Sequence, residues 1–204
     1  MSYIKNKYNY LSSISGDINE HLPTLFNYAK ECESVIELGV RGCVSSWALA
    51  YGLLNNNKPN KKFLLNDINS CDITELLDNT KNLDISVNYQ WINDLELQID
   101  ENVDLTFIDT WHVYAQLKRE LDKYSKITNK YIIMHDTEID EIVGETIRNG
   151  WNAYQQSIDT GFPIDEINCG LQKAIDDFLE NNENWKLKEQ FRNNNGLTIL
   201  ERIY

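Results

Sequence analysis

Acidic side chains that follow short apolar runs are the residues of this sequence most suited to chemistry. Four of the runs end at or next to one of them, namely Glu37, Asp67, Asp109 and Asp136, and Asp94 follows a fifth run. Ionised carboxylates accept hydrogen bonds and attract positive charge, so a set of them suits a ligand with hydroxyl groups and a cation. A pyrophosphate beside Glu37 would be repelled.

Two of the three histidines, His112 and His135, stand beside these carboxylates in the sequence. The sequence leaves two interpretations open for each. His112 is either a neutral general base or a polar residue at a helix N-terminus, where the helix dipole disfavours the protonated ring. His135 is either a metal ligand or base, or a hydrogen-bonded residue at a strand end. We expect His21 to pack or cap within the first helix.

The elements that must position these residues alternate along the chain. Apolar runs predict parallel strands, and amphipathic stretches between them predict helices, in five strand–helix units. The predicted strands are 34–38, 62–66, 85–91, 103–108 and 131–134, and the predicted helices are about 17–32, 45–54, 73–81, 112–124 and 171–179. Residues 185–191 and 197–203 predict a closing β-hairpin. The fold class is therefore α/β, with a doubly wound, mostly parallel sheet of seven strands and a C-terminal antiparallel hairpin.

The first predicted strand leads into a loop with Gly39 and Gly42, and then into a helix. Strand, glycine turn and helix are typical of the cofactor site of an α/β domain. We expect residues 1–204 to form a single domain, with 1–15 loosely ordered. The irregular stretch 137–168 is a candidate substrate lid.

Bulk properties narrow the range of partners. The 204 residues carry a net charge of −13, which disfavours nucleic acid and anionic membranes. No apolar run approaches a membrane span, no signal peptide is visible, and the four cysteines lie far apart, so we expect a cytoplasmic protein. The expected partner is a small-molecule or glycan substrate, and a homodimer stays open.

Three stretches resemble the class I S-adenosylmethionine-dependent methyltransferases. They are residues 35–46 (VIELGVRGCVSS), 107–114 (FIDTWHVY) and 131–137 (YIIMHDT), within a similarity that extends over about 17–204. The chain looks most like the small-molecule and sugar O-methyltransferase branch and the cephalosporin-hydroxylase-like proteins. The resemblance implies a Rossmann-like fold. One departure is that Arg41 and Cys43 stand where that family commonly has glycine.

The resemblance also implies roles for individual residues toward S-adenosylmethionine. Glu37, the Gly39 loop and Ser45 would face its methionine end. Asp67 would accept hydrogen bonds from the ribose hydroxyls, and Asp94 from the adenine amino group. Asp109 would lie beneath the sulfonium and the substrate.

The implied reaction is O-methylation of a small molecule, sugar or glycan precursor, with His112, Asp109 and His135 as catalytic residues. Related metal-dependent enzymes place a metal site at positions that correspond to Asp109, His135 and Asp136 here. A divalent ion, Mg²⁺ or Mn²⁺, therefore stays open. Two alternatives are a non-catalytic binding or scaffold protein with this fold, and a nucleotide-sugar or dinucleotide enzyme.

Overall fold

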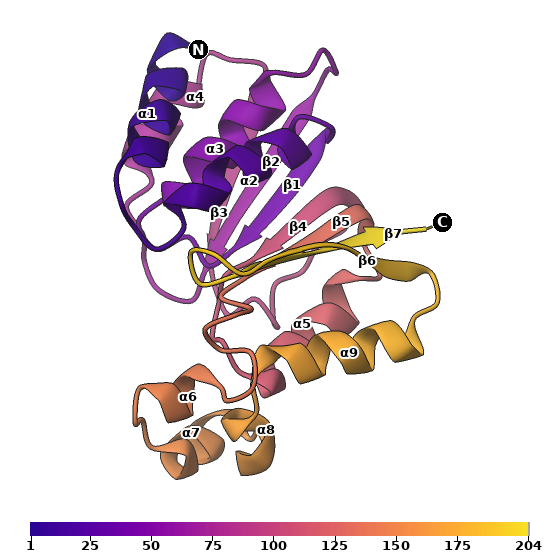
Figure 1. Cartoon of the computed structure of the whole chain (residues 1–204). Helices are drawn as coiled ribbons and strands as arrows, with labels where there is room; N and C mark the ends of the chain where they lie inside the picture. The colour runs from indigo at the N-terminus through magenta and orange to yellow at the C-terminus, as the bar shows by residue number, and fades with distance from the viewer. Residues whose placement is uncertain (204) are drawn as a thin grey trace.

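The computed structural model describes residues 1–203, and a single sheet of seven strands runs through them (Figure 1). The strand order is β3-β2-β1-β4-β5-β7-β6. The strands are β1 (Ser34–Leu38), β2 (Lys61–Asp67), β3 (Ile85–Trp91), β4 (Val103–Ile108), β5 (Thr128–His135), β6 (Trp185–Phe191) and β7 (Leu197–Arg202). The first five are parallel, and β7 pairs antiparallel with both β5 and β6. The predicted α/β fold with its closing hairpin is confirmed.

Side chains of the central strands enter two apolar cores, one on each face of the sheet. In β1, Val35 points into one core while Ile36 and Leu38 point into the other. A parallel strand covered on both faces is apolar nearly throughout, which is why this run was readable as a strand. Helices α1 (Ser2–Ser13), α2 (Leu22–Ala29), α3 (Val44–Leu54) and α4 (Thr74–Thr80) serve the first core, and α5 (Tyr114–Tyr124) and α9 (Leu171–Asn181) serve the second (Figure 1). A short 3₁₀ helix, η1 (Asn19–His21), precedes α2.

The N-terminal segment differs from the expectation of loose order, because Ser2–Ser13 forms α1. Ile4 is fully buried, and the ring of Tyr8 lies 5.5 Å from that of Phe26 and 5.2 Å from that of Tyr51. These contacts with α2 and α3 stabilise a helix that its own polar composition would not hold.

Two further connections differ from the predicted strand–helix units. Residues 92–102, between β3 and β4, form bends, a turn and irregular chain, without a helix. Helix α5 begins at Tyr114, so His112 precedes the helix and does not lie within its first turn. The segment 137–168 contains three short helices, α6 (Glu145–Arg148), α7 (Ala153–Thr160) and α8 (Ile164–Asn168), which form a group of their own below the sheet in Figure 1.

The strand order reverses between β1 and β4, which are neighbours although β2 and β3 come between them in sequence. The loops leaving these two strands diverge to opposite faces, and open α/β sheets bind ligands in that crevice. Backbone bonds fix the start of both loops: Gly39 N donates to Asn66 O at 2.9 Å, and Asp109 N donates to Leu38 O at 2.8 Å.

Candidate functional site

A cavity of about 1000 Å³ lies at the carboxyl ends of the parallel strands. Its wall is built from the loops after β1, β2, β3 and β4, from residues 11–19, and from parts of the segment 137–168. Of the predicted cofactor residues, all but Glu37 line it: Gly39, Ser45, Asp67, Asp94 and Asp109. Carboxylates dominate the charge of the wall, since Arg41 and His112 are the basic residues among its lining residues within 1–203.

Gly39 is the residue that lets the β1 loop pass close to the β4 loop. Its φ is +87°, and a Cβ placed there would lie 1.9 Å from the carbonyl oxygen of Asp109. Arg41 and Cys43 also have positive φ, at 41° and 59°. The loop therefore keeps a left-handed backbone at the two positions where the resembling family commonly has glycine.

Asp67 holds this loop in place. Its Oδ2 accepts hydrogen bonds from the backbone N–H groups of Val40 (2.9 Å) and Arg41 (3.0 Å), and its Oδ1 accepts one from Asn69 (2.8 Å). Burial alone would raise the pKa of Asp67, but these three donors outweigh it and lower the pKa. An ionised carboxylate is therefore fixed at the end of β2, and Oδ1 keeps acceptor capacity for a ligand hydroxyl.

Glu37 lies beneath the cavity wall. It is fully buried, and the hydroxyl of Ser45, which does line the cavity, donates a hydrogen bond to its Oε1. Burial raises the pKa of Glu37 to about 8, against hydrogen bonds from Ser45 and Ser46 that lower it. The structure thus places Ser45 between Glu37 and the cavity.

His112 and His135 lie next to two of the acidic strand-end residues, Asp109 and Asp136. His112 Nε2 lies 3.2 Å from Asp109 Oδ1 and 3.2 Å from Asp136 Oδ2. Among residues 1–203, Asp109, His112 and Asp136 form the group of three whose ligating atoms, one from each, all lie within 4.8 Å of one another. His135 Nδ1 is 3.5 Å from Asp109 and 3.3 Å from Asp136, while its Nε2 lies 3.1 Å from the carbonyl oxygen of Asn194.

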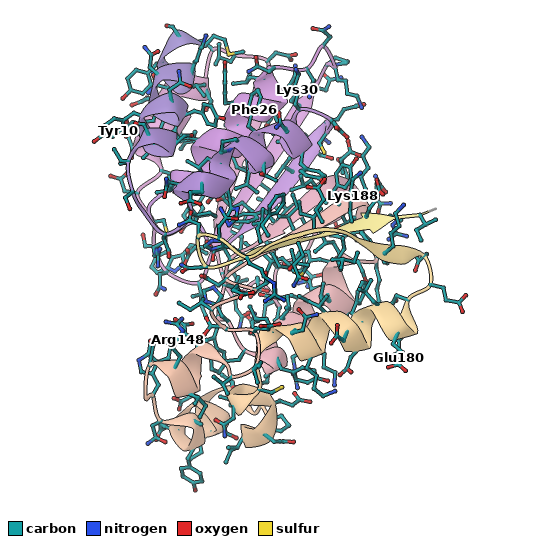
Figure 2. All side chains as sticks on the ribbon, viewed as in Figure 1. Tyr10, Phe26, Lys30, Arg148, Glu180 and Lys188 are labelled. Atoms are coloured by element: carbon teal, nitrogen blue, oxygen red, sulfur yellow. The ribbon has the colours of Figure 1, made fainter. Side chains whose placement is uncertain are left out.

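Two carboxylates from the segment 137–168 complete the surroundings of His112. Asp140 Oδ2 lies 3.3 Å from His112 Nδ1, and Glu145 Oε2 lies 3.7 Å from the same atom. Asp140 is fully buried and takes two hydrogen bonds from the guanidinium of Arg148, at 2.6 and 2.9 Å. Figure 2 shows Arg148 on α6, on the side that faces the sheet. Sequence reasoning missed both carboxylates, because nothing in an irregular stretch indicates which side chains turn inward.

The charges in this cluster are set by proximity. Burial opposes protonation of His112, but the hydrogen bond to Asp109 and the nearby carboxylates of Asp140 and Asp136 raise its pKa well above the usual value. The carboxylates Asp109 and Asp136 likewise outweigh burial and raise the pKa of His135 to about 10. Burial acts to raise the pKa of Asp109, but the hydrogen bond from His112 and the charges of both rings hold it well below its usual range. The carboxylates therefore favour the protonated, cationic form of both histidines.

Aromatic side chains close the end of the cavity near this cluster. Trp111 and Trp151 line it, and the ring of Phe162 stacks on Trp111 with centroids 6.4 Å apart and planes 14° apart. Trp151 and Phe162 come from the predicted lid, so that segment does form part of the wall. His21, as expected, packs: its Nε2 lies 2.9 Å from the carbonyl oxygen of Asn193, and its ring centroid is 5.7 Å from that of His135.

Comparison with known proteins identifies the fold. No protein-family model matches the sequence, and no curated protein matches it. Among solved structures, the chain is similar to the N-methyltransferase NodS from Bradyrhizobium japonicum WM9 in complex with S-adenosyl-L-homocysteine (15% identity, 98% of this chain and 100% of that one, TM-score 0.58). It is also similar to an O-methyltransferase from Bacillus cereus, again with S-adenosylhomocysteine (15%, 99% and 91%, TM-score 0.58). A third is the O-methyltransferase TomG from Streptomyces achromogenes with S-adenosylmethionine (11%, 94% and 82%, TM-score 0.58).

The chain therefore has the fold of the class I S-adenosylmethionine-dependent methyltransferases. The similar structures include both N- and O-methyltransferases, so the fold does not select the acceptor atom. None of the helices within residues 1–203 is both long and apolar enough to cross a membrane. The four cysteines are free thiols.

Proposed function

We propose that this protein transfers the methyl group of S-adenosylmethionine to a hydroxyl group of a small molecule, sugar or glycan precursor. The observation that carries the proposal is a single cavity whose wall includes both the β1 and β2 loops and the imidazole–carboxylate cluster at Asp109 and His112. A donor on the loops and an acceptor at the cluster would then meet inside one enclosure, as an in-line displacement requires.

The charge of the wall supports this donor. S-adenosylmethionine carries a sulfonium cation and two ribose hydroxyls, and Asp67 and Asp109 are ionised acceptors that would attract both features. Gly39 and Ser45 would contact the methionine end, with Glu37 acting on it through Ser45. Asp94 would accept a hydrogen bond from the adenine amino group. A nucleotide-sugar enzyme is less well supported, because Arg41 pairs with Asp17 at 2.7 Å and is the one guanidinium on the wall.

We further propose that the cluster binds the acceptor with the help of a divalent cation held by Asp109, His112 and Asp136. One imidazole nitrogen and two carboxylate oxygens are a donor set that fits Mn²⁺ or a related transition metal, and all three atoms are close enough to share one ion. A bound ion would supply Lewis acidity, which lowers the pKa of an acceptor hydroxyl. This proposed metal site differs from the one that the resemblance implied, because His112 replaces His135 as the histidine ligand.

The protonation of His112 bears on its role as a base. An imidazolium has no lone pair, so His112 can serve as a base or as a metal ligand only after its own proton has left, and a ring that holds the ion through Nε2 leaves the acceptor's proton to another group. A cation among the same carboxylates would favour that loss, because it lowers the pKa of the neighbouring imidazole. Asp140 and Glu145 would then orient the ring through Nδ1.

The first test is ligand binding to the unmodified chain. We expect S-adenosylhomocysteine to raise the melting temperature and to bind in calorimetry, because a ligand that binds only the folded state stabilises it by mass action. Radiolabelled methyl transfer onto a panel of monosaccharides and phenols, with and without Mn²⁺, then identifies the acceptor class. Failure of S-adenosylhomocysteine to bind would leave the scaffold alternative standing.

The second test separates the cluster from the cofactor loops. Substitution of His112 by Ala should abolish Mn²⁺ binding and turnover but leave the affinity for S-adenosylhomocysteine within about twofold, because Asp67, and not His112, holds the β1 loop by hydrogen bonds. Asp159→Asn removes an exposed carboxylate from the same cavity and serves as the matched control. In the unsubstituted protein, Mn²⁺ affinity should rise with pH, since binding displaces the proton of His112. Turnover by His112→Ala at the normal rate would refute the assignment.

A further inference from the structure

Two carboxyl groups meet behind the cavity wall. Glu120, on α5, is fully buried, and Asp94, in the β3–β4 connection, is 7% exposed. The side-chain amide of Gln116 donates a hydrogen bond to both of them, to Asp94 Oδ1 at 3.0 Å and to Glu120 Oε1 at 2.9 Å. One amide nitrogen therefore holds the two carboxyl groups next to each other in the interior.

Each of these groups has one oxygen without a hydrogen-bond donor in the described part of the chain. Asp94 Oδ2 and Glu120 Oε2 are both buried, and neither has a partner there. Two ionised carboxylates buried side by side would repel each other. Each oxygen without a donor would also lose its hydration without gaining a hydrogen bond, which destabilises the folded state. A single proton between them removes one charge and gives both oxygens a partner.

The neighbouring cation offsets only part of the charge of the pair, because burial raises the pKa of Asp94 despite the charge of Lys123. Lys123 Nζ is the cation beside Asp94, but it donates to the backbone carbonyls of Asp94 and Leu97, at 2.6 Å each. Tyr124 also donates to the carbonyl of Asp94, at 2.7 Å, and Thr110 donates its hydroxyl to Glu120 Oε1 at 2.5 Å. Burial, followed by the charge of Asp94, raises the pKa of Glu120 well above its usual value.

We infer that Asp94 and Glu120 share one proton, which Glu120 Oε2 carries and donates to Asp94 Oδ2. Glu120 is then a positioning residue: it fixes one rotamer of Asp94 and keeps that carboxylate ionised at the cavity wall. Asp94, Thr110 and Gln116 all line the cavity, and Glu120 lies behind them, hydrogen-bonded to Thr110 and Gln116.

The shared proton has a consequence for ligand choice that rests on the proposed function. An ionised Asp94 only accepts hydrogen bonds, so this part of the wall selects a ligand that offers an N–H donor. The 6-amino group of adenine fits, whereas a 6-oxo purine places a carbonyl oxygen against the carboxylate and carries its N–H on the neighbouring N1. The site should therefore prefer S-adenosylhomocysteine over S-inosylhomocysteine, and Glu120 should be needed for that preference.

Infrared spectroscopy of the ligand-free chain tests the proton directly. The carbonyl stretch of a protonated carboxyl group should be present at neutral pH and should lose one component in Glu120→Gln. A second component should come from Glu37, which is also buried; it should disappear near pH 8 and be absent in Glu37→Gln. Glu180 is exposed on α9 (Figure 2), so Glu180→Gln should leave the spectrum unchanged. A spectrum of Glu120→Gln identical to that of the parent protein would overturn the inference whatever the chain binds.

Calorimetry tests the positioning role. Glu120→Gln keeps a neutral donor toward Asp94 and should bind S-adenosylhomocysteine within about twofold of the parent, whereas Glu120→Ala should lose about tenfold, the effect of one hydrogen bond. Glu120→Ala should also narrow the preference over S-inosylhomocysteine, which a loss of stability alone would not do. If Glu120→Ala does not fold, Asp94→Asn should shift the Glu120 component to lower pH. Equal losses in the Gln and Ala variants would refute the donor role, and absence of binding in the parent would refute only the proposed function.

Discussion

Gly39 is the residue on which the shape of the cofactor loop depends most. A Cβ at this position would overlap the carbonyl oxygen of Asp109, and φ is in the left-handed region. We expect Gly39→Ala to lower the free energy of unfolding by about 2 kcal/mol or more, combining strain with displacement of the β4 loop. Urea unfolding measures this, and S-adenosylhomocysteine affinity should fall in parallel.

Gly42 is the matched control for that substitution. It lies in the same loop, its φ is not positive, and a Cβ at this position would meet nothing within 4 Å. Gly42→Ala should change the free energy of unfolding by less than about 1 kcal/mol. Equal destabilisation by both substitutions would show that the contact with Asp109 is not the reason that Gly39 is needed.

Glu37 gives the stability of the protein a specific pH dependence. Its pKa is about 8 in the folded state and near the ordinary value of 4.5 when the chain unfolds. Between these values the folded state binds more protons than the unfolded state, so this residue's contribution to stability is complete below about pH 4.5 and is lost as pH rises through 8. Glu37→Gln should remove that loss. In urea titrations, the free energy of unfolding of the variant minus that of the parent should therefore increase from pH 5 to pH 9.

At the scale of secondary structure, α1 can be tested as an ordered helix packed on the core. Ile4 is fully buried beneath it, whereas Tyr10 on the same helix is 59% exposed. Ile4→Ala should lower the free energy of unfolding by about 2–4 kcal/mol, and Tyr10→Ala by less than about 1 kcal/mol. A loosely ordered N-terminus would make both substitutions neutral.

The same scale shows which elements the sequence could predict. The strands at Ser34–Leu38 and Val103–Ile108 were predictable, because a strand covered on both faces is a local apolar run. Helix α1 was not, because its buried Ile4 and partly buried Tyr8 and Leu11 are separated mostly by polar residues, and it is stabilised by contacts with α2 and α3. Its spacing of four and then three residues was the available signal.

Some residues of the candidate site could also be predicted from the sequence, and others could not. Carboxylates at strand ends, such as Asp67 and Asp109, were predictable because parallel strands bring their carboxyl ends to one edge. Asp140 and Glu120 were not, because their positions depend on how the segment 137–168 folds back and on which side of α5 faces Asp94. For Glu120 the available signal was its spacing of four residues from Gln116.

At the scale of the whole molecule, the net charge of −13 makes stability depend on salt. Self-repulsion among excess carboxylates destabilises the folded state, and salt screens it. Raising NaCl from about 0.01 M to 0.15 M shortens the Debye length from about 30 Å to 8 Å and should raise the melting temperature. Calorimetric scans at both concentrations measure this, and an unchanged melting temperature would show that the ion pairs already balance the excess charge.

The left-handed Arg41 and Cys43 have a consequence for the thermodynamics of ligand binding. Glycines at these positions would adopt the same backbone with less strain, but they would leave the loop more freedom when it is empty. Side chains at both positions, together with the backbone hydrogen bonds to Asp67, restrict the loop before any ligand arrives. Less conformational entropy is then lost on association, so binding at this end of the cavity should have a smaller entropic penalty than in a relative with a glycine-rich loop.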